Sequence, residues 1–158
     1  MKLSFRNKKK TLYIVIIIAV CFLVYNLVWY LIVENKYDVY IAGMERSTET
    51  VIRVSGKHFS APADNVDYTV KYPNYLEYVG NLAVVKRDTR EALIIWPGIA
   101  GKDEYGLILE HENEIHQIMV DKDMAPIDSQ DAAIIANTED TIRILVDAAN
   151  DKWPGILE

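Results

Sequence analysis

A run of 23 consecutive residues without a charged side chain, residues 11–33, constrains this chain more than any other feature. An α-helix rises about 1.5 Å per residue, so the run reaches roughly 35 Å as a helix and can cross a hydrocarbon core of about 30 Å. Its length and its content of Ile, Val and Leu favour a membrane span over the buried core helix of a soluble domain. The sequence therefore predicts a transmembrane helix over residues 11–33.

Cleavage of this segment after export is not expected. The apolar region of a secretory signal is shorter, about 7 to 15 residues, and it ends at small residues where a peptidase cuts. Here the run ends in "WYLIVENKYD", which has no such pattern. Lipid attachment at Cys21 would need a small residue just before it, and that position holds Val20. We expect an uncleaved anchor.

Basic residues predict the orientation of the anchor. Residues 1–10 hold five of the 17 Lys and Arg residues and no acid, whereas only Lys36 follows the run closely. Positive charge is retained on the cytoplasmic side of a membrane. We therefore expect residues 1–10 to be a cytoplasmic basic tip, and the body, residues 34–158, to be an extracytoplasmic domain.

Aromatic and polar residues of the run also have expected positions. Tyr and Trp favour membrane interfaces, which predicts Tyr13 at the inner interface and Trp29 and Tyr30 at the outer one. Asn26 is the one strongly polar residue of the span. Its amide can bond to a second helix or to backbone and headgroups, and we favour the latter because no small-xxx-small pattern supports close helix approach.

The body is acidic. It contains all 23 Asp and Glu residues and the remaining 12 Lys and Arg residues, a net charge of −11. This balance argues against nucleic-acid binding, which depends on Lys and Arg contacts to phosphate. It suits a partner with a basic surface, although acidity also serves solubility alone. The only cysteine is Cys21, so no disulfide can close within the body, which suits a bacterium that exports proteins without relying on disulfides.

Alternation gives the clearest strand signal, in "VDYTVKY" at residues 66–72. Its apolar and aromatic residues share one face, and its polar residues share the other. Residue composition and turn signals predict further strands over residues 37–41, 50–55, 82–87 and 91–96, the last two joined as a hairpin about 88–90.

A second hairpin is predicted over residues 105–121. A three-residue loop, 112–114, would pair Leu107 with Met119 and place Glu110 opposite His116, which are complementary charges. A two-residue loop at residues 112–113 is the competing register.

The C-terminal part changes to a helical pattern. Ser129 is a candidate cap for a short helix, and Thr138, followed by two acids, is a candidate start for a second one. Apolar residues over 142–149 recur at helical spacing, and Pro154 closes the pattern. Strands followed by helices predict an α+β fold, with one N-terminal transmembrane helix, a small antiparallel sheet and a C-terminal helix.

The motif "HENEIH" invites comparison with zinc sites. Zinc proteases place two histidines four residues apart on one helical face. His111 and His116 are five apart, so they diverge by about 140° on a helix and point to opposite faces of a strand. Glu112, Glu114 and His116 could share a strand face, but that breaks the hairpin turn. We expect a polar hairpin tip and no metal.

Other catalytic or ligand motifs are also not predicted. The acids of residues 121–128 have a spacing found in calcium loops, but Pro126 replaces the flexible glycine and further oxygen ligands are missing. The chain has no G-x-S-x-G motif and no phosphate-binding glycine motif. We therefore expect neither an enzyme nor a cofactor.

Tyrosines provide the one candidate partner site. Tyr75 and Tyr78 follow Pro73, where a rigid turn would present large side chains with polar tips. Together these patterns predict a non-catalytic binding or accessory module of a bacterial envelope complex, with the lipid bilayer and a basic envelope protein as partners.

Two alternatives to a binding module stay open. An immunity-type protein would neutralise a toxin at the outer membrane face, because an acidic body attracts a cationic toxin. An envelope enzyme acting on wall or lipid substrates would need a deep pocket with converging titratable groups.

Overall fold

The computed structural model describes residues 3–47, 56–98 and 101–157, with side chains from Lys10 onward. The chain divides into two compact units, Met1–Lys36 and Tyr37–Glu158, which are described in turn. The strand predicted over residues 50–55 lies outside the described residues.

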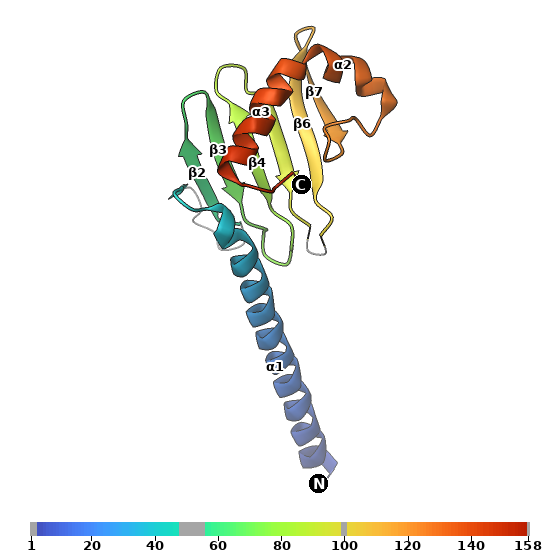
Figure 1. Cartoon of the computed structure of the whole chain (residues 1–158). Coiled ribbons are helices and arrows are strands. Elements are labelled where there is room, and N and C mark those ends of the chain that lie inside the picture. Colours follow the sequence, from blue (N-terminus) through green and yellow to red (C-terminus); the bar gives the residue numbers. More distant parts are fainter. Residues whose placement is uncertain (1–2, 48–55, 99–100, 158) are drawn as a thin grey trace. The chain divides into compact units, whose positions relative to one another are not determined.

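Helix α1, Leu3–Tyr37, forms the first unit except for its last residue, which belongs to the second unit (Figure 1). The helix is long and apolar enough to span a membrane, and it includes the whole predicted span. Asn26 donates from Nδ2 to the carbonyl oxygen of Phe22 at 2.7 Å, which is the kind of backbone partner that we favoured over a second helix.

The second unit begins with a 3₁₀ turn instead of the strand predicted over residues 37–41, so that prediction is wrong. The turn η1, Asp38–Tyr40, follows α1 directly. The turn brings the side chains of Tyr37 and Asp38 to the segment that connects the strand of residues 66–71 with the strand of residues 81–86. The Gly80 N–H donates to Tyr37 Oη at 2.6 Å, and Tyr72 Oη donates to Asp38 Oδ1 at 2.7 Å. A strand would direct these two side chains to opposite faces.

Seven antiparallel strands form one open sheet in chain order (Figure 1). This order needs only hairpin connections, which short turn-rich segments can provide. The strands are β1 (Glu45–Arg46), β2 (His58–Pro62), β3 (Val66–Lys71), β4 (Asn81–Lys86), β5 (Ala92–Trp96), β6 (Glu104–His111) and β7 (Glu114–Val120).

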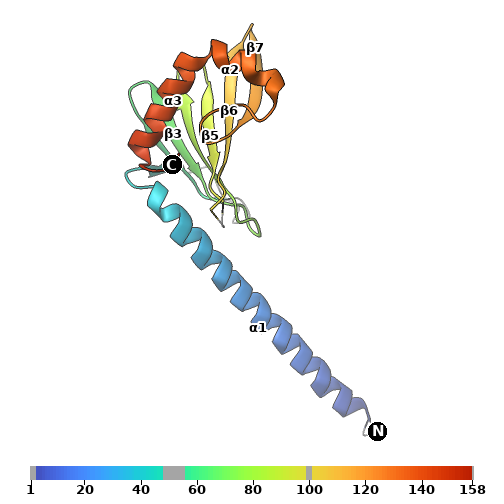
Figure 2. The same ribbon diagram turned by 45° about the vertical axis from the view of Figure 1, so that its right-hand side comes forward.

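Helices cover one face of this sheet. The chain leaves β7 through η2 (Ser129–Asp131) and α2 (Ala132–Asn137), and α3 (Glu139–Lys152) then packs across β4 and β5 (Figure 2). The buried residues of α3 are Ile142, Leu145 and Ala149, within the predicted apolar stripe. These observations confirm the α+β fold.

The core lies between α3 and the covered face of the sheet. The predicted alternation in β3 is confirmed, since Val66 and Val70 are buried and Tyr68 packs edge-on against Trp153 with ring centroids 5.7 Å apart. The other side chains of the covered face with at most 2% exposure are Leu82, Val84, Leu93, Ile95, Leu107, Leu109, Ile118 and Val120.

The hairpin between β6 and β7 has the competing register. Leu107 pairs with Ile118, and the loop has two residues, Glu112 and Asn113, with φ of 53° and 64°. Two positive φ values define the turn whose twist matches paired strands. The three-residue loop was therefore wrong. It would have turned Ile118 away from the core, because a one-residue slip exchanges the faces.

The predicted helix caps also differ from the structure. Asp128, not Ser129, caps the first turn, and its Oδ1 accepts from the Gln130 N–H at 3.0 Å. Thr138 precedes α3 as predicted, but its hydroxyl donates to the Ile134 carbonyl oxygen at 2.8 Å instead of capping α3. The short break between α2 and α3 makes this backbone acceptor available.

Candidate functional site

The second face of the sheet is the largest feature that the core does not use. No described element of the second unit covers it, since α3 packs on the opposite side (Figure 2). Its middle row, read from the strand register, contains Ala83, Ile94, Gly106 and Met119, and Met119 is 43% exposed. We call this surface the open face.

Trp96 makes the centre of the open face flat. A Cβ built on Gly106 would lie 2.9 Å from Trp96 Cζ3, so the indole ring lies directly against this glycine. A larger residue on β6 would push the ring away from the sheet. The glycine thus creates a broad apolar surface, which Ile108 on β6 and Ile115 on β7 continue.

Charged side chains stand at both ends of the open face. Arg87, which follows β4, forms an ion pair of 2.6 Å with Asp67 on β3, and this hydrogen bond raises the pKa of Arg87. On β6, Glu104 and Glu110 are exposed. An apolar centre with polar ends is the usual organisation of a protein-binding surface.

The sequence contained a signal for this surface. Residues 82–85 and 92–96 are continuous apolar runs rather than alternating ones. Such runs indicate strands that are apolar on both faces. The hairpin prediction for these segments is confirmed, but it did not consider the second face.

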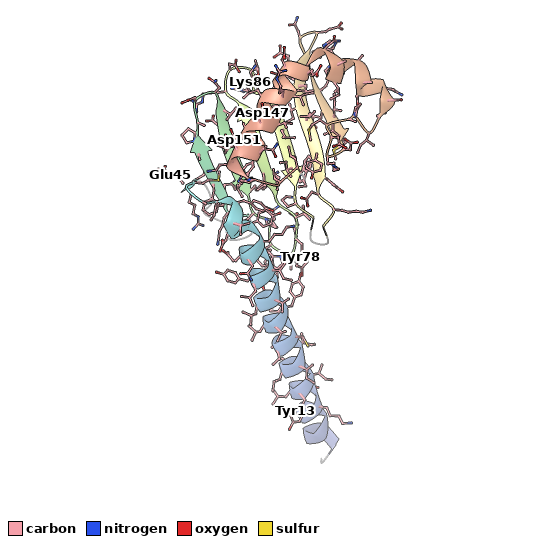
Figure 3. The ribbon with its side chains drawn as sticks, in the orientation of Figure 1. Tyr13, Glu45, Tyr78, Lys86, Asp147 and Asp151 are labelled. Atoms are coloured by element: carbon pink, nitrogen blue, oxygen red, sulfur yellow. The ribbon has the colours of Figure 1, made fainter. Side chains whose placement is uncertain are left out.

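Tyr75 and Tyr78 lie in the connection between β3 and β4, where both are half-buried. Tyr78 is labelled in Figure 3. Between them, Leu76 is 55% exposed and has a φ of 73°, so the turn presents an aliphatic side chain as well. That the two tyrosines bind a partner stays a prediction.

The two histidines come closer together than their spacing suggested. His111 ends β6 and His116 lies on β7, and their ring centroids are 6.2 Å apart. The two-residue turn folds both onto the same face, so the argument that a strand would separate them was wrong. Among the described residues, however, no group of three or more His, Cys, Asp or Glu side chains could hold a metal.

The acids of residues 121–128 are bound to their own backbone. Asp121 Oδ1 accepts from the N–H groups of Asp123 and Ala125, each at 2.9 Å. Such local bonds stabilise a turn and need no ion.

Glu91 is the buried carboxylate among the described residues, with 6% exposure. It lies 3.6 Å from Lys86 Nζ, which is labelled in Figure 3, and accepts from the hydroxyls of Thr89 at 2.8 Å and Thr141 at 3.3 Å. Its other oxygen accepts from the Glu110 N–H. These partners join β4, the turn before β5, β6 and α3, so the group serves as a structural connection.

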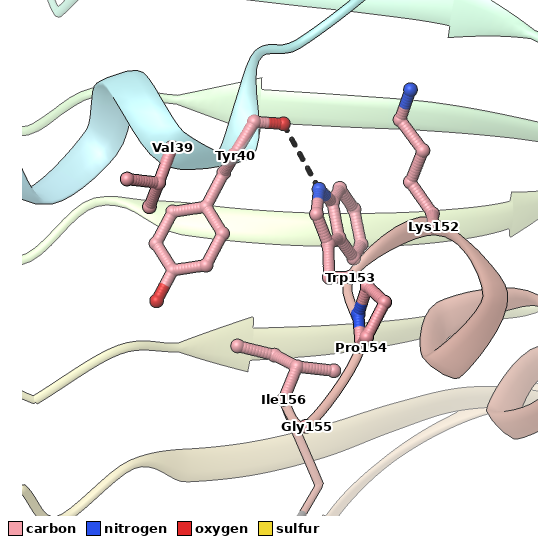
Figure 4. A pocket seen from close by; sticks show the side chains of 7 residues that line it. All are labelled: Val39, Tyr40, Lys152, Trp153, Pro154, Gly155 and Ile156. Carbon is pink, nitrogen blue, oxygen red and sulfur yellow. Dashed lines mark hydrogen bonds between the residues drawn. The ribbon is translucent and has the colours of Figure 1, made fainter.

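A shallow hollow of about 230 Å³ lies beside the C-terminal segment (Figure 4). Trp153 Nε1 donates to the Tyr40 carbonyl oxygen at 2.9 Å, and Lys152 Nζ donates to the Ala42 carbonyl oxygen at 3.0 Å. The side-chain nitrogens of Lys152 and Trp153 therefore bind the backbone. The lining residues are Val39, Tyr40, Lys152, Trp153, Pro154, Gly155 and Ile156.

Two tyrosines of the covered face hold the same segment. Tyr105 Oη donates to the Ile156 carbonyl oxygen at 3.3 Å, and Tyr68 packs on Trp153. Burial raises the pKa of both phenols, helped by the charge of Asp103 for Tyr105 and of Asp151 for Tyr68. Both phenols are neutral at neutral pH and do not resemble an activated base.

Polar groups elsewhere in the interior are also satisfied. Among the described residues, every buried side-chain nitrogen or oxygen has a hydrogen-bond partner. None is therefore left directed at a missing ligand, and the open face is the feature of the second unit best suited to recognition. Comparisons with protein-family models, curated proteins and solved structures found no match for this chain.

Proposed function

We propose that this chain is a non-catalytic binding module, anchored in a bacterial membrane by α1, which recognises proteins with its extracytoplasmic body. The observation that carries the proposal is the open face. One face of the sheet is closed by α3, while the other keeps an apolar centre that includes Ile94 and Trp96. Exposed apolar surface rimmed by polar residues is typical of protein–protein interaction sites.

The alternative of an envelope enzyme has less support. The hollow beside Trp153 is shallow, and its Lys152 and Trp153 groups bond to backbone carbonyls. Glu91 is held by four partners inside the fold. A catalytic acid or base must instead reach a substrate.

Photo-crosslinking tests the binding function. A benzophenone amino acid placed at Ile94 reports on the open face, and one placed at Ala136, which is exposed on α2, is the matched control. In intact membranes, we expect a discrete protein adduct from position 94 and far less from position 136. Equal labelling at both positions, or no protein adduct at all, would remove the proposal.

The proposed orientation has a separate test. The basic tip places the N-terminus in the cytoplasm. Protease added to intact spheroplasts should remove the body after about Lys36 and leave an N-terminal tag protected. A body that stays intact until the membrane is permeabilised would reverse the orientation.

We further propose that a basic envelope protein approaches the outward side of α3. Asp147 and Asp151 are exposed there and are labelled in Figure 3, and Ile144 is 43% exposed. Asp140 is exposed as well but pairs with Arg143 at 2.7 Å. Charge of this kind acts mainly on the association rate. Association with such a partner should slow as salt rises from low to physiological concentration, and a salt-independent rate would contradict this part of the proposal.

A further inference from the structure

We propose that a second copy of this chain occupies the open face, so that two bodies pack sheet against sheet about a two-fold axis parallel to the strands and between β4 and β5. This inference rests on the proposed function, because it takes the open face to be a binding surface. It leaves the outward side of α3 available to another protein.

Charges at one end of the open face are arranged to match themselves. Strand register places Lys71 on β3 and Glu104 on β6 in one transverse row, with Asn81 and Trp96 between them. Neither Lys71 nor Glu104 forms an ion pair within the described part of the chain. The proposed axis exchanges β3 with β6, so it brings Lys71 of one copy opposite Glu104 of the other, twice.

The other end of the face also carries both signs of charge. Arg87 and Arg90 lie in the turn between β4 and β5, and Glu110 lies on β6 at the same end of the sheet. The axis places this end of one copy against the same end of the other. Asp67 already holds Arg87 in place at 2.6 Å.

An axis perpendicular to the strands would place each strand on its own copy in reverse. Centred on Leu107, it would bring Glu104 of one copy against Glu110 of the other; centred on the middle row, it would bring Lys71 against Asp67 but leave Glu104 against the apolar Ile108. A uniformly basic partner would meet Lys71 and Arg87 as like charges. Because the open face carries basic and acidic side chains at separate positions, its charges favour a second copy related by the axis parallel to the strands.

The area of the face is of the right order for a stable contact. Six strands about 4.8 Å apart and about 20 Å long, β2 to β7, present roughly 600 Å² in projection. Side chains that rise from this plane increase the accessible area toward the roughly 800 Å² per partner of a typical specific interface. Anchoring both copies in one membrane raises their effective concentration.

Cysteine crosslinking tests the arrangement in liposomes that contain only this protein. The full chain carries Cys21→Ser, which removes its only cysteine, together with Lys71→Cys and Glu104→Cys. A short bismaleimide should convert most of this variant to dimer. Each single-cysteine variant is a matched control, because like residues would lie about 17 Å apart across the axis, given strand and sheet spacings of about 4.8 and 10 Å.

Charge reversal gives an independent measurement that needs no crosslink. By energy transfer between labelled chains in the same liposomes, Lys71→Glu should weaken self-association several-fold, and Lys71→Glu with Glu104→Lys should restore it. Circular dichroism checks that each variant is folded. Equal crosslinking of single and double variants, or no rescue by the second reversal, would overturn the arrangement.

The two proposals can fail separately. If liposomes show no self-association while position 94 captures a different protein in native membranes, the second-copy proposal fails and the binding function stands. If position 94 captures no protein and the liposomes contain only monomer, both proposals fail.

Discussion

The two faces of one sheet differ in what their side chains do. On the covered face, Leu93 and Ile95 are fully buried beneath α3. On the open face, Ile94, their neighbour in the same strand, stays partly exposed. Adjacent residues of one strand therefore differ in role: Leu93 and Ile95 stabilise the fold, and Ile94 is available for the recognition that we propose.

This difference follows from the period of a strand. Side chains alternate between faces, so an apolar run such as "ALIIW" must supply apolar residues to both. A single helix can cover only one face. The open face remains apolar although no described helix of the second unit covers it, which is the reason for proposing that it binds a partner.

The largest expected effect compares Leu93 with Ile94. Leu93→Ala should destabilise the fold by about 2 to 5 kcal/mol, because it leaves a cavity beneath α3. Ile94→Ala should cost less than about 1 kcal/mol and should instead weaken association. Denaturant unfolding of the full chain in detergent, followed by tryptophan fluorescence, measures both. Similar losses for the two variants would show that the open face is part of the core.

A smaller effect compares two glutamates. Glu91→Ala should cost about 2 to 3 kcal/mol, because Lys86 and the two threonine hydroxyls lose their buried acceptor. Glu110→Ala, on the open face, should change stability by no more than about 0.5 kcal/mol. The same unfolding assay applies, and a Glu91 variant as stable as the Glu110 variant would contradict its role as a connection.

Alkaline pH should loosen the covered face. The pKa values of Tyr68 and Tyr105 are raised above their usual 10.0, first by burial. Above pH 10 the unfolded chain loses these phenolic protons before the folded chain does, so stability is constant below pH 10 and falls as pH rises toward the folded pKa values. Melting temperature against pH measures this loss.

The control for the alkaline effect is Tyr105→Phe. It should cost about 0.5 to 1.5 kcal/mol at neutral pH, through the lost hydrogen bond to Ile156, and should make the alkaline loss shallower. An unchanged alkaline slope in this variant would exclude Tyr105 as a contributor.

The smallest effect concerns the turn that sets the faces of β7. Glu112 adopts a φ of 53°, a conformation that Asn accepts more readily than Glu. Glu112→Asn should therefore stabilise the hairpin by about 0.5 kcal/mol. Asn113→Ala is the opposite change, because Asn113 has a φ of 64° that Ala accepts poorly, and it should lower the stability of the hairpin. A loss of stability in both variants would contradict the turn assignment.

The sequence by itself determined the elements whose signal is local. Composition and length were enough to predict a helix able to span a membrane over residues 11–33. The period of residues 66–72 was enough to assign a strand and its buried face. The α+β class followed from the order of these patterns.

Only the tertiary structure decided which distant residues each side chain contacts. The strand propensity of Tyr37 allows it to begin a strand. Its hydroxyl oxygen, however, accepts a buried hydrogen bond from the Gly80 N–H, which favours a turn after α1. Charge alone did not decide between the two possible registers of β6 and β7. The observed register is the one that buries Ile118 and Val120. His111 and His116 lie close together because the turn between β6 and β7 brings them onto one face, which their separation of five residues in the sequence does not reveal.

The open face, too, was decided only by the tertiary structure. Tyr75 and Tyr78 were proposed from their own neighbourhood, whereas the open face exists only because seven strands align and α3 covers one side of them. The apolar runs in β4 and β5 were readable in the sequence, but which of their residues would remain uncovered was not. That choice depends on contacts of α3 with β5 and with the residue before it, Glu91, which accepts a hydrogen bond from Thr141, 50 residues further along the chain.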